Sequence, residues 1–122
     1  MYQVSVEGHF DAAHFLREYG GKCENLHGHR FTVVVSLKAE RLNKVGLAYD
    51  FTELRRHLNE VLERFDHTSL NELKPFDKIN PSSENIAREI YDQVQKRLSE
   101  GVLLSNVEVW ESPESRVTYS LE

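Results

Sequence analysis

Apolar and polar residues alternate along two stretches in the first third of the chain, and this pattern predicts two β-strands. The first stretch runs from Tyr2 to His14 and the second from His29 to Ala39. Strand residues two positions apart point to the same side of a sheet, so one face of the second strand is apolar. The residues on this face are Phe31, Val33, Val35 and Leu37. Between the stretches, Glu-Tyr-Gly-Gly at residues 18–21 predicts a turn.

In the middle of the chain the apolar residues recur every three or four positions, which is typical of amphipathic helices. The first such segment follows Asp50, and the second follows Ser82 and Ser83; all three residue positions are candidate N-caps. The apolar stripes are Phe51, Leu54, Leu58, Val61, Leu62 and Phe65 in the first, and Ile86, Ile90, Val94 and Leu98 in the second. Gly101 stands where a C-cap belongs. The intervening residues 66–80 are expected to be irregular.

Alternation returns at residues 102–111 and 116–121, which predicts a final hairpin with its turn at residues 112–115. The order of elements is therefore ββααββ. It implies one α+β domain over residues 1–122, with a four-stranded antiparallel sheet and two helices on one face. The other face and the sheet edges need cover, and oligomerisation is the simplest way to provide it.

Composition narrows the classes of protein that fit. The 122 residues include 15 Lys and Arg against 20 Asp and Glu, a net charge of −5, which disfavours a nucleic-acid binder. No apolar run is long enough to span a membrane, and the N-terminus shows no signal-peptide pattern. Cys23 is the only cysteine, so no disulfide can form within the chain. We therefore expect a cytoplasmic protein with neither nucleic acid nor membrane as a partner.

Three histidines form the clearest candidate for a metal site. His27 and His29 are separated only by Gly28, so in a strand they project to the same side, roughly 7 Å apart. His14, at the end of the preceding predicted strand, can supply a third nitrogen across the hairpin. Three imidazoles with one open position are typical of catalytic zinc, whereas the ordinary alternative is a set of surface or core histidines. Cys23 is then either a fourth ligand of a closed structural site or a nearby thiol whose pKa the zinc charge lowers.

Two further positions carry candidate chemistry. Asp66 precedes His67, and a neighbouring acid can set the tautomer of a histidine and raise its basicity, although such pairs are also common at helix ends. Glu111 alternates with Val107 and Val109, which puts a carboxylate on an apolar strand face. A carboxylate there is costly unless it is paired, but a charged strand residue also commonly protects a sheet edge.

Six blocks of the sequence, in order, resemble one family. Cys23–His29 reads C-x-x-x-H-G-H and is similar to the signature of the 6-pyruvoyl-tetrahydropterin synthase and 6-carboxytetrahydropterin synthase superfamily. The other blocks are Phe10–His14, Ala48–Phe51, Phe65–Asn71, Asn80–Ala87 and Val109–Ser112. The resemblance covers nearly the whole chain and implies the tunnelling fold (T-fold). In this fold, trimers close their sheets into a barrel and stack into homohexamers (dimers of trimers), with sites at the subunit interfaces.

The resemblance also implies roles for the candidate residues. His14, His27 and His29 would bind Zn²⁺. The substrate would be 7,8-dihydroneopterin triphosphate, with the pterin ring anchored by Glu111. The proton-abstracting thiolate would be Cys23, the acid/base pair Asp66 and His67, and the residues lining the pterin pocket Ser82, Ser83 and Glu84. Lys22 and Arg30 are candidates for binding the triphosphate.

Spacing distinguishes branches of the family. The three-residue gap between Cys23 and His27 resembles the bacterial 6-carboxytetrahydropterin synthases of queuosine biosynthesis, lyases that would release acetaldehyde and triphosphate. Glu24, three residues before His27, also resembles the glutamate of a branch that forms 6-hydroxymethyl-7,8-dihydropterin. Its ordinary interpretation is a solvated loop residue. The alternatives are a 6-pyruvoyl-tetrahydropterin synthase, which eliminates triphosphate, or a non-catalytic structural zinc or pterin-binding module.

Overall fold

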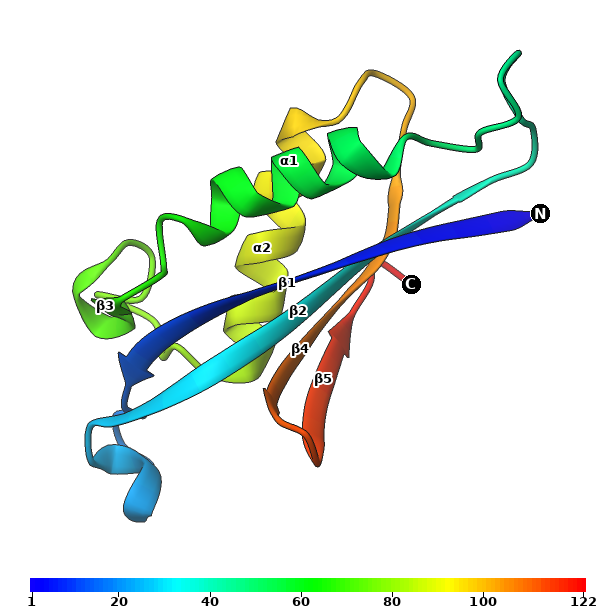
Figure 1. Ribbon diagram of the computed structural model, residues 1–122. Coiled ribbons are helices and arrows are strands. Elements are labelled where there is room, and N and C mark those ends of the chain that lie inside the picture. The colour runs from blue at the N-terminus through cyan, green and yellow to red at the C-terminus, as the bar shows by residue number, and fades with distance from the viewer.

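The computed structural model describes residues 1–122 as a twisted sheet with two helices on one face (Figure 1). The strands are β1 (Tyr2–His14), β2 (His27–Ala39), β3 (Thr68–Ser69), β4 (Leu104–Ser112) and β5 (Ser115–Tyr119). The helices are α1 (Phe51–Leu62) and α2 (Ser83–Arg97), and two short 3-10 turns are η1 (Lys22–Glu24) and η2 (Leu70–Glu72). Neither α-helix has the length and apolar character needed to cross a bilayer.

The predicted α+β architecture is confirmed, but the sheet has five strands rather than four and is mixed rather than wholly antiparallel. Its strand order is β3-β1-β2-β4-β5. The extra strand β3 runs parallel to β1, pairing Thr68 with Ala12 and Ser69 with Ala13. The backbone N–H of His67 donates to the Asp11 carbonyl at 2.6 Å, which brings the chain beside β1 as it leaves α1. A two-residue strand is too short to show alternation, so residues 66–80 were expected to be irregular.

Strand β2 begins at His27, two residues earlier than predicted, because the antiparallel register pairs His27 with His14. The same register places Ala12 opposite His29. Residues on opposed strands at one register position point to the same face. The end of β1 and the start of β2 therefore present their histidines side by side.

The helix starts follow the predicted capping, whereas the end of α2 does not. The Asp50 carboxylate accepts the Thr52 N–H at 2.8 Å, and the Ser82 hydroxyl accepts the Asn85 N–H at 3.1 Å. Helix α2 ends at Arg97, short of Gly101. The Gln95 side chain explains the early end, because it bonds the Val102 carbonyl at 2.7 Å and the Leu104 N–H at 2.9 Å. These bonds hold the link to β4, and Gly101 lies within that link at φ +86°.

Four phenylalanines join the sheet to the segment beyond α1. Phe10 stacks on Phe31 with ring centroids 4.9 Å apart, and Phe65 lies 5.6 Å from Phe10 and 6.0 Å from Phe76. All four are fully buried. Phe65 was expected within the first helix, but it follows the helix end and packs inward from the turn. The ring therefore anchors the chain between α1 and β3 to the core.

Phe65→Ala should lower the free energy of unfolding by about 3–5 kcal/mol, because it leaves a cavity between the rings of Phe10 and Phe76. The measurement is denaturant unfolding at a fixed protein concentration. Phe51→Ala is the matched control, since Phe51 is 54% exposed and its loss should cost less than about 1 kcal/mol. Equal losses in the two variants would contradict the assignment of Phe65 to the core.

Both edges of the sheet are open over most of their length. Strand β3 covers β1 only at Ala12 and Ala13, so residues 2–11 have no strand beside them on that side. Strand β5 forms the opposite edge. The helices cover one face alone (Figure 1). Such edges are templates for pairing with another chain.

Candidate functional site

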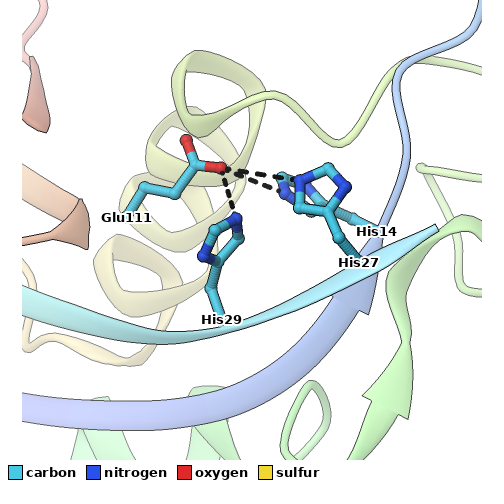
Figure 2. Close-up of side chains that lie close together, drawn as sticks. All are labelled: His14, His27, His29 and Glu111. Carbon is cyan, nitrogen blue, oxygen red and sulfur yellow. Dashed lines mark hydrogen bonds and ion pairs between the residues drawn. The ribbon is translucent and has the colours of Figure 1, made fainter. Parts of the chain in front are cut away.

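Four side chains from three strands converge at one end of the sheet. They are His14 at the end of β1, His27 and His29 at the start of β2, and Glu111 near the end of β4. Each offers one ligand atom, and these atoms lie within 4.8 Å of one another. Figure 2 shows the Glu111 carboxylate pointing at the three rings. The structure thus brings together the three predicted ligands and adds Glu111 to them.

The distances around the carboxylate are short. Glu111 Oε1 lies 3.2 Å from His14 Nε2, 3.0 Å from His29 Nε2 and 4.0 Å from His27 Nε2. Its second oxygen, Oε2, accepts a hydrogen bond from the Ser83 hydroxyl at 3.2 Å. His14 is buried, whereas the side chains of His27, His29 and Glu111 are each about one-third exposed. The cluster is therefore open to solvent on one side.

Backbone carbonyls fix the tautomers of two of the histidines. His14 Nδ1 lies 2.7 Å from the Pro81 carbonyl, and His27 Nδ1 lies 2.7 Å from the Asn25 carbonyl. A carbonyl only accepts, so each Nδ1 carries the proton and each neutral ring presents its Nε2 lone pair to the cluster. Burial lowers the pKa of His29, which also favours its neutral form.

The Glu111 carboxylate is charged. When His14 carries a proton on Nε2, its hydrogen bond and charge, with smaller contributions from His29 and the Ser83 hydroxyl, lower the pKa of Glu111 to about 2, against the opposing effect of burial. Converging Nε2 lone pairs and a carboxylate repel one another unless a proton or a cation lies between them. A divalent metal ion fits this donor set, and carbonyl-oriented imidazoles are the usual surroundings of such an ion.

A cavity of about 240 Å³ adjoins the cluster. It is lined by His14, His27 and Glu111, by the predicted Cys23, Ser82, Ser83 and Glu84, and by Leu16, Ser115, Arg116 and Val117. The Cys23 sulfur does not belong to the group of converging ligand atoms. This geometry favours a thiol beside the metal position over a fourth ligand in a closed structural site.

Glu24 does not line this cavity. It is exposed in η1, and its carboxylate accepts a hydrogen bond from the backbone N–H of Gly20. The side chain therefore closes the turn that precedes Cys23. The predicted catalytic role of Glu24 requires it to leave this contact.

Asp66 and His67 form a pair, but they lie away from Cys23 within one chain. Asp66 Oδ2 is 3.0 Å from His67 Nδ1, and Asp66 Oδ1 accepts the Asp11 N–H at 2.8 Å. The bond from the Asp11 backbone, followed by that from His67, lowers the pKa of Asp66. His67 lines a separate surface depression that His29 also borders, and the His67 side chain is 78% exposed.

Sequence reasoning missed the contribution of β5 to the cavity. Arg116 supplies the only guanidinium or ammonium group that lines it, and this guanidinium lies 4.6 Å over the Trp110 ring. Arg116 pairs with Trp110 in the β4–β5 ladder, directly beside Glu111. The predicted hairpin contained this signal, because a strand that begins at Arg116 after a turn at residues 112–115 starts next to the end of β4. Lys22 and Arg30 do not line the cavity.

Comparison with known proteins decides the family. The family model for 6-pyruvoyl tetrahydropterin synthase matches residues 3–122. The chain belongs to the 6-pyruvoyl tetrahydropterin synthase family. The resemblance of the six sequence blocks is thus confirmed.

Relatives within the family carry different names. The chain is 34% identical over 124 residues to the 6-carboxy-5,6,7,8-tetrahydropterin synthase of Synechocystis sp., covering 98% of this chain and 93% of that protein. It is 35% identical over 112 residues to the dihydroneopterin monophosphate aldolase of Pyrococcus furiosus, covering 92% and 91%. The structure of 6-pyruvoyl tetrahydropterin synthase from Caenorhabditis elegans superposes with a TM-score of 0.88 at 28% identity, covering 100% and 98%. The T-fold is thereby confirmed.

Proposed function

We propose that the protein is a 6-carboxy-5,6,7,8-tetrahydropterin synthase, a carbon–carbon lyase. It converts 7,8-dihydroneopterin triphosphate with release of acetaldehyde and triphosphate, as a step of queuosine biosynthesis. The observation that carries the proposal is the convergence of three Nε2 atoms beside a cavity that also contains Cys23 and Glu111. The similarity to the Synechocystis synthase over nearly the whole chain supports this branch.

His14, His27 and His29 hold Zn²⁺ in this proposal. When bound, the ion supplies Lewis acidity, which makes the hydroxyls and the neighbouring C–H bonds of the substrate side chain more acidic. The protein contributes a rigid set of neutral ligands, because the Pro81 and Asn25 carbonyls orient two of the rings. No reorganisation of these rings is then needed when the substrate enters.

The remaining residues bind the substrate and move protons. The Cys23 thiolate removes a carbon-bound proton at the wall of the cavity. The Glu111 carboxylate, held by Ser83 at the start of α2, accepts hydrogen bonds from the pterin 2-amino group and ring N–H. Ser82, Ser83 and Glu84 line the pterin pocket. Asp66 accepts the Nδ1 proton of His67, which leaves Nε2 free to give or take a proton.

A single chain does not bring His67 to the Cys23 cavity, so we propose that the site is completed between subunits. The exposed Asp66–His67 pair serves the cavity of a neighbouring copy. The open edges of β1 and β5, on opposite sides of one sheet, permit head-to-tail pairing that closes a ring. The proposed assembly is a homohexamer made of two trimers.

A second candidate activity is the formation of 6-hydroxymethyl-7,8-dihydropterin. It rests on Glu24, three residues before His27, and on the similarity to a relative named as an aldolase. Formation of a 6-pyruvoyl product is the third candidate, after the name of the nematode structure. A purely structural zinc module is disfavoured because the Cys23 sulfur stands outside the converging ligand atoms.

Incubation of the zinc-loaded protein with 7,8-dihydroneopterin triphosphate tests the proposal. Mass spectrometry of the pterin product should identify 6-carboxy-5,6,7,8-tetrahydropterin, with acetaldehyde released in equal amount. A 6-pyruvoyl product would overturn the proposed activity. A 6-hydroxymethyl product alone would favour the second candidate, and binding without turnover would identify a pterin-binding module.

Glu111→Gln should weaken pterin binding sharply while the metal content and the oligomer stay unchanged. The substitution removes charge-assisted hydrogen bonds, each contributing roughly 1.5–3 kcal/mol. Titration calorimetry with a pterin ligand and metal analysis of the same sample measure both effects. Because Glu111 Oε1 also faces the three imidazoles, loss of metal from this variant would instead identify Glu111 as a ligand.

A further inference from the structure

Beyond His14, the backbone of Phe15 and Arg17 is hydrogen-bonded by asparagine side chains rather than by a strand. Asn71 Oδ1 accepts the Phe15 N–H at 3.0 Å, and Asn71 Nδ2 donates to the Phe15 carbonyl at 3.1 Å. Likewise, Asn80 Oδ1 accepts the Arg17 N–H at 2.9 Å, and Asn80 Nδ2 donates to the Arg17 carbonyl at 3.0 Å. Each amide thus satisfies both backbone groups of one residue, as an antiparallel strand partner does.

Leu16, between the two clamped residues, faces the other side. Its backbone N–H donates to the Cys23 carbonyl at 2.6 Å. Leu16 lies between two residues whose backbone groups are held, so the bonds to Phe15 and Arg17 also restrict the direction of the Leu16 N–H. Leu16 and Cys23 line the same cavity. The position of the Cys23 backbone is therefore coupled to the two asparagine amides.

The asparagines stand on a segment that is itself held firmly. Asn71 is buried, and the Asn85 side chain donates to the Asn80 carbonyl at 2.9 Å. The Arg17 guanidinium returns to this segment and donates to the Phe76 carbonyl at 2.8 Å. The next residue after Asn80 is Pro81, whose carbonyl orients His14. One segment, residues 71–81, therefore places both a proposed metal ligand and the Cys23 turn.

We propose that Asn71 and Asn80 are positioning residues that place the Cys23 thiol relative to the imidazole cluster through the backbone of residues 15–17. The expected effect of this placement on catalysis rests on the proposed function, in which the Cys23 thiolate is the base. Only a primary amide of this length offers one acceptor and one donor side by side. Aspartate keeps the acceptor and loses the donor, and alanine loses both.

The test compares Asn80→Asp and Asn71→Asp with the wild type in zinc-loaded protein. We expect kcat to fall by about 100-fold with little change in KM, because misplacing a reacting group by about 1 Å has this effect. Alkylation of Cys23 by iodoacetamide should become faster, because the released turn exposes the thiol. Since Cys23 is the only cysteine, the alkylation rate reports this position alone. Zinc content should stay at the wild-type level.

Asn43→Ala is the matched control. Its side chain also holds backbone N–H groups of a loop, those of Val45 and Leu47, but it lies beyond the far end of β2. It should leave kcat and the alkylation rate unchanged. Variants of Asn71 and Asn80 that behave like the Asn43 variant would overturn the proposal.

Hydrogen exchange on the wild-type protein tests the same coupling without a substitution. The amide of Leu16 should exchange as slowly as the amides within β1, since it is held by Cys23 between two clamps. Exchange of Leu16 as fast as an exposed loop amide would overturn the proposal even if the variants fail to fold. Neither alkylation nor hydrogen exchange requires turnover. Suppose that the wild type gives no pterin product, but that its Leu16 amide exchanges slowly and the asparagine variants are alkylated faster. This result would contradict the proposed function and leave the positioning role intact.

Discussion

His29→Ala should abolish the proposed zinc binding, whereas Cys23→Ala should leave it intact. His29 Nε2 is one of three converging imidazole nitrogens, and the Cys23 sulfur is not among the converging ligand atoms. Even outer-shell substitutions at metal sites lower affinity by about 10–100-fold, so the loss of a ligand should cost at least about 100-fold. Metal analysis after dialysis against a competing chelator measures the difference.

His9→Ala is the control for this experiment, because His9 also lies on β1 but outside the cluster. It should keep wild-type zinc content. Equal zinc loss in the His29 and Cys23 variants would contradict the catalytic-thiol assignment and favour a structural module with a thiolate ligand. Retention of zinc by the His29 variant would remove this histidine from the ligand set.

The histidine cluster follows closely from local sequence, because strand geometry alone brings its members together. His27 and His29 share a face by the two-residue period, and the antiparallel register sets His14 opposite His27. The same alternation along β4 predicts that Glu111 lies on the face of Val107 and Val109, which are both fully buried. That Glu111 lies beside the histidines depends in addition on the pairing of β4 with β2, which alternation along one strand does not show.

Structural features that depend on contacts between distant segments could not be predicted from the local sequence pattern. The two residues of β3 are too few to show a period, and their pairing with β1 depends on the turn after α1. Asp66 and His67 match a family block, but the sequence does not reveal that neither lines the Cys23 cavity and that His67 lines a separate depression. The amides of Asn71 and Asn80 belong to a segment without periodicity, so their pairing with residues 15 and 17 becomes visible only in three dimensions.

Cys23→Ala should abolish the formation of 6-carboxytetrahydropterin. A carbon-bound proton is not removed without a positioned base, and loss of such a base typically slows a reaction by about 10²–10⁴-fold. Single-turnover assays with the zinc-loaded variant, with the pterin products separated by chromatography, provide the measurement. Wild-type zinc content in the same sample is required, so that the loss is assigned to the thiol and not to the metal.

The same assay decides the role of Glu24. If its carboxylate is a second base, Cys23→Ala should still form 6-hydroxymethyl-7,8-dihydropterin, because a carboxylate can accept a proton from a substrate hydroxyl and start carbon–carbon cleavage without a thiolate. Glu24→Gln should then remove only that product, since glutamine keeps an oxygen to accept the Gly20 N–H but is not a base. If Cys23→Ala forms neither product while keeping its zinc and fold, Glu24 serves only to close the turn before Cys23. If the wild type forms the 6-pyruvoyl product, the inference from the three-residue gap between Cys23 and His27 is wrong.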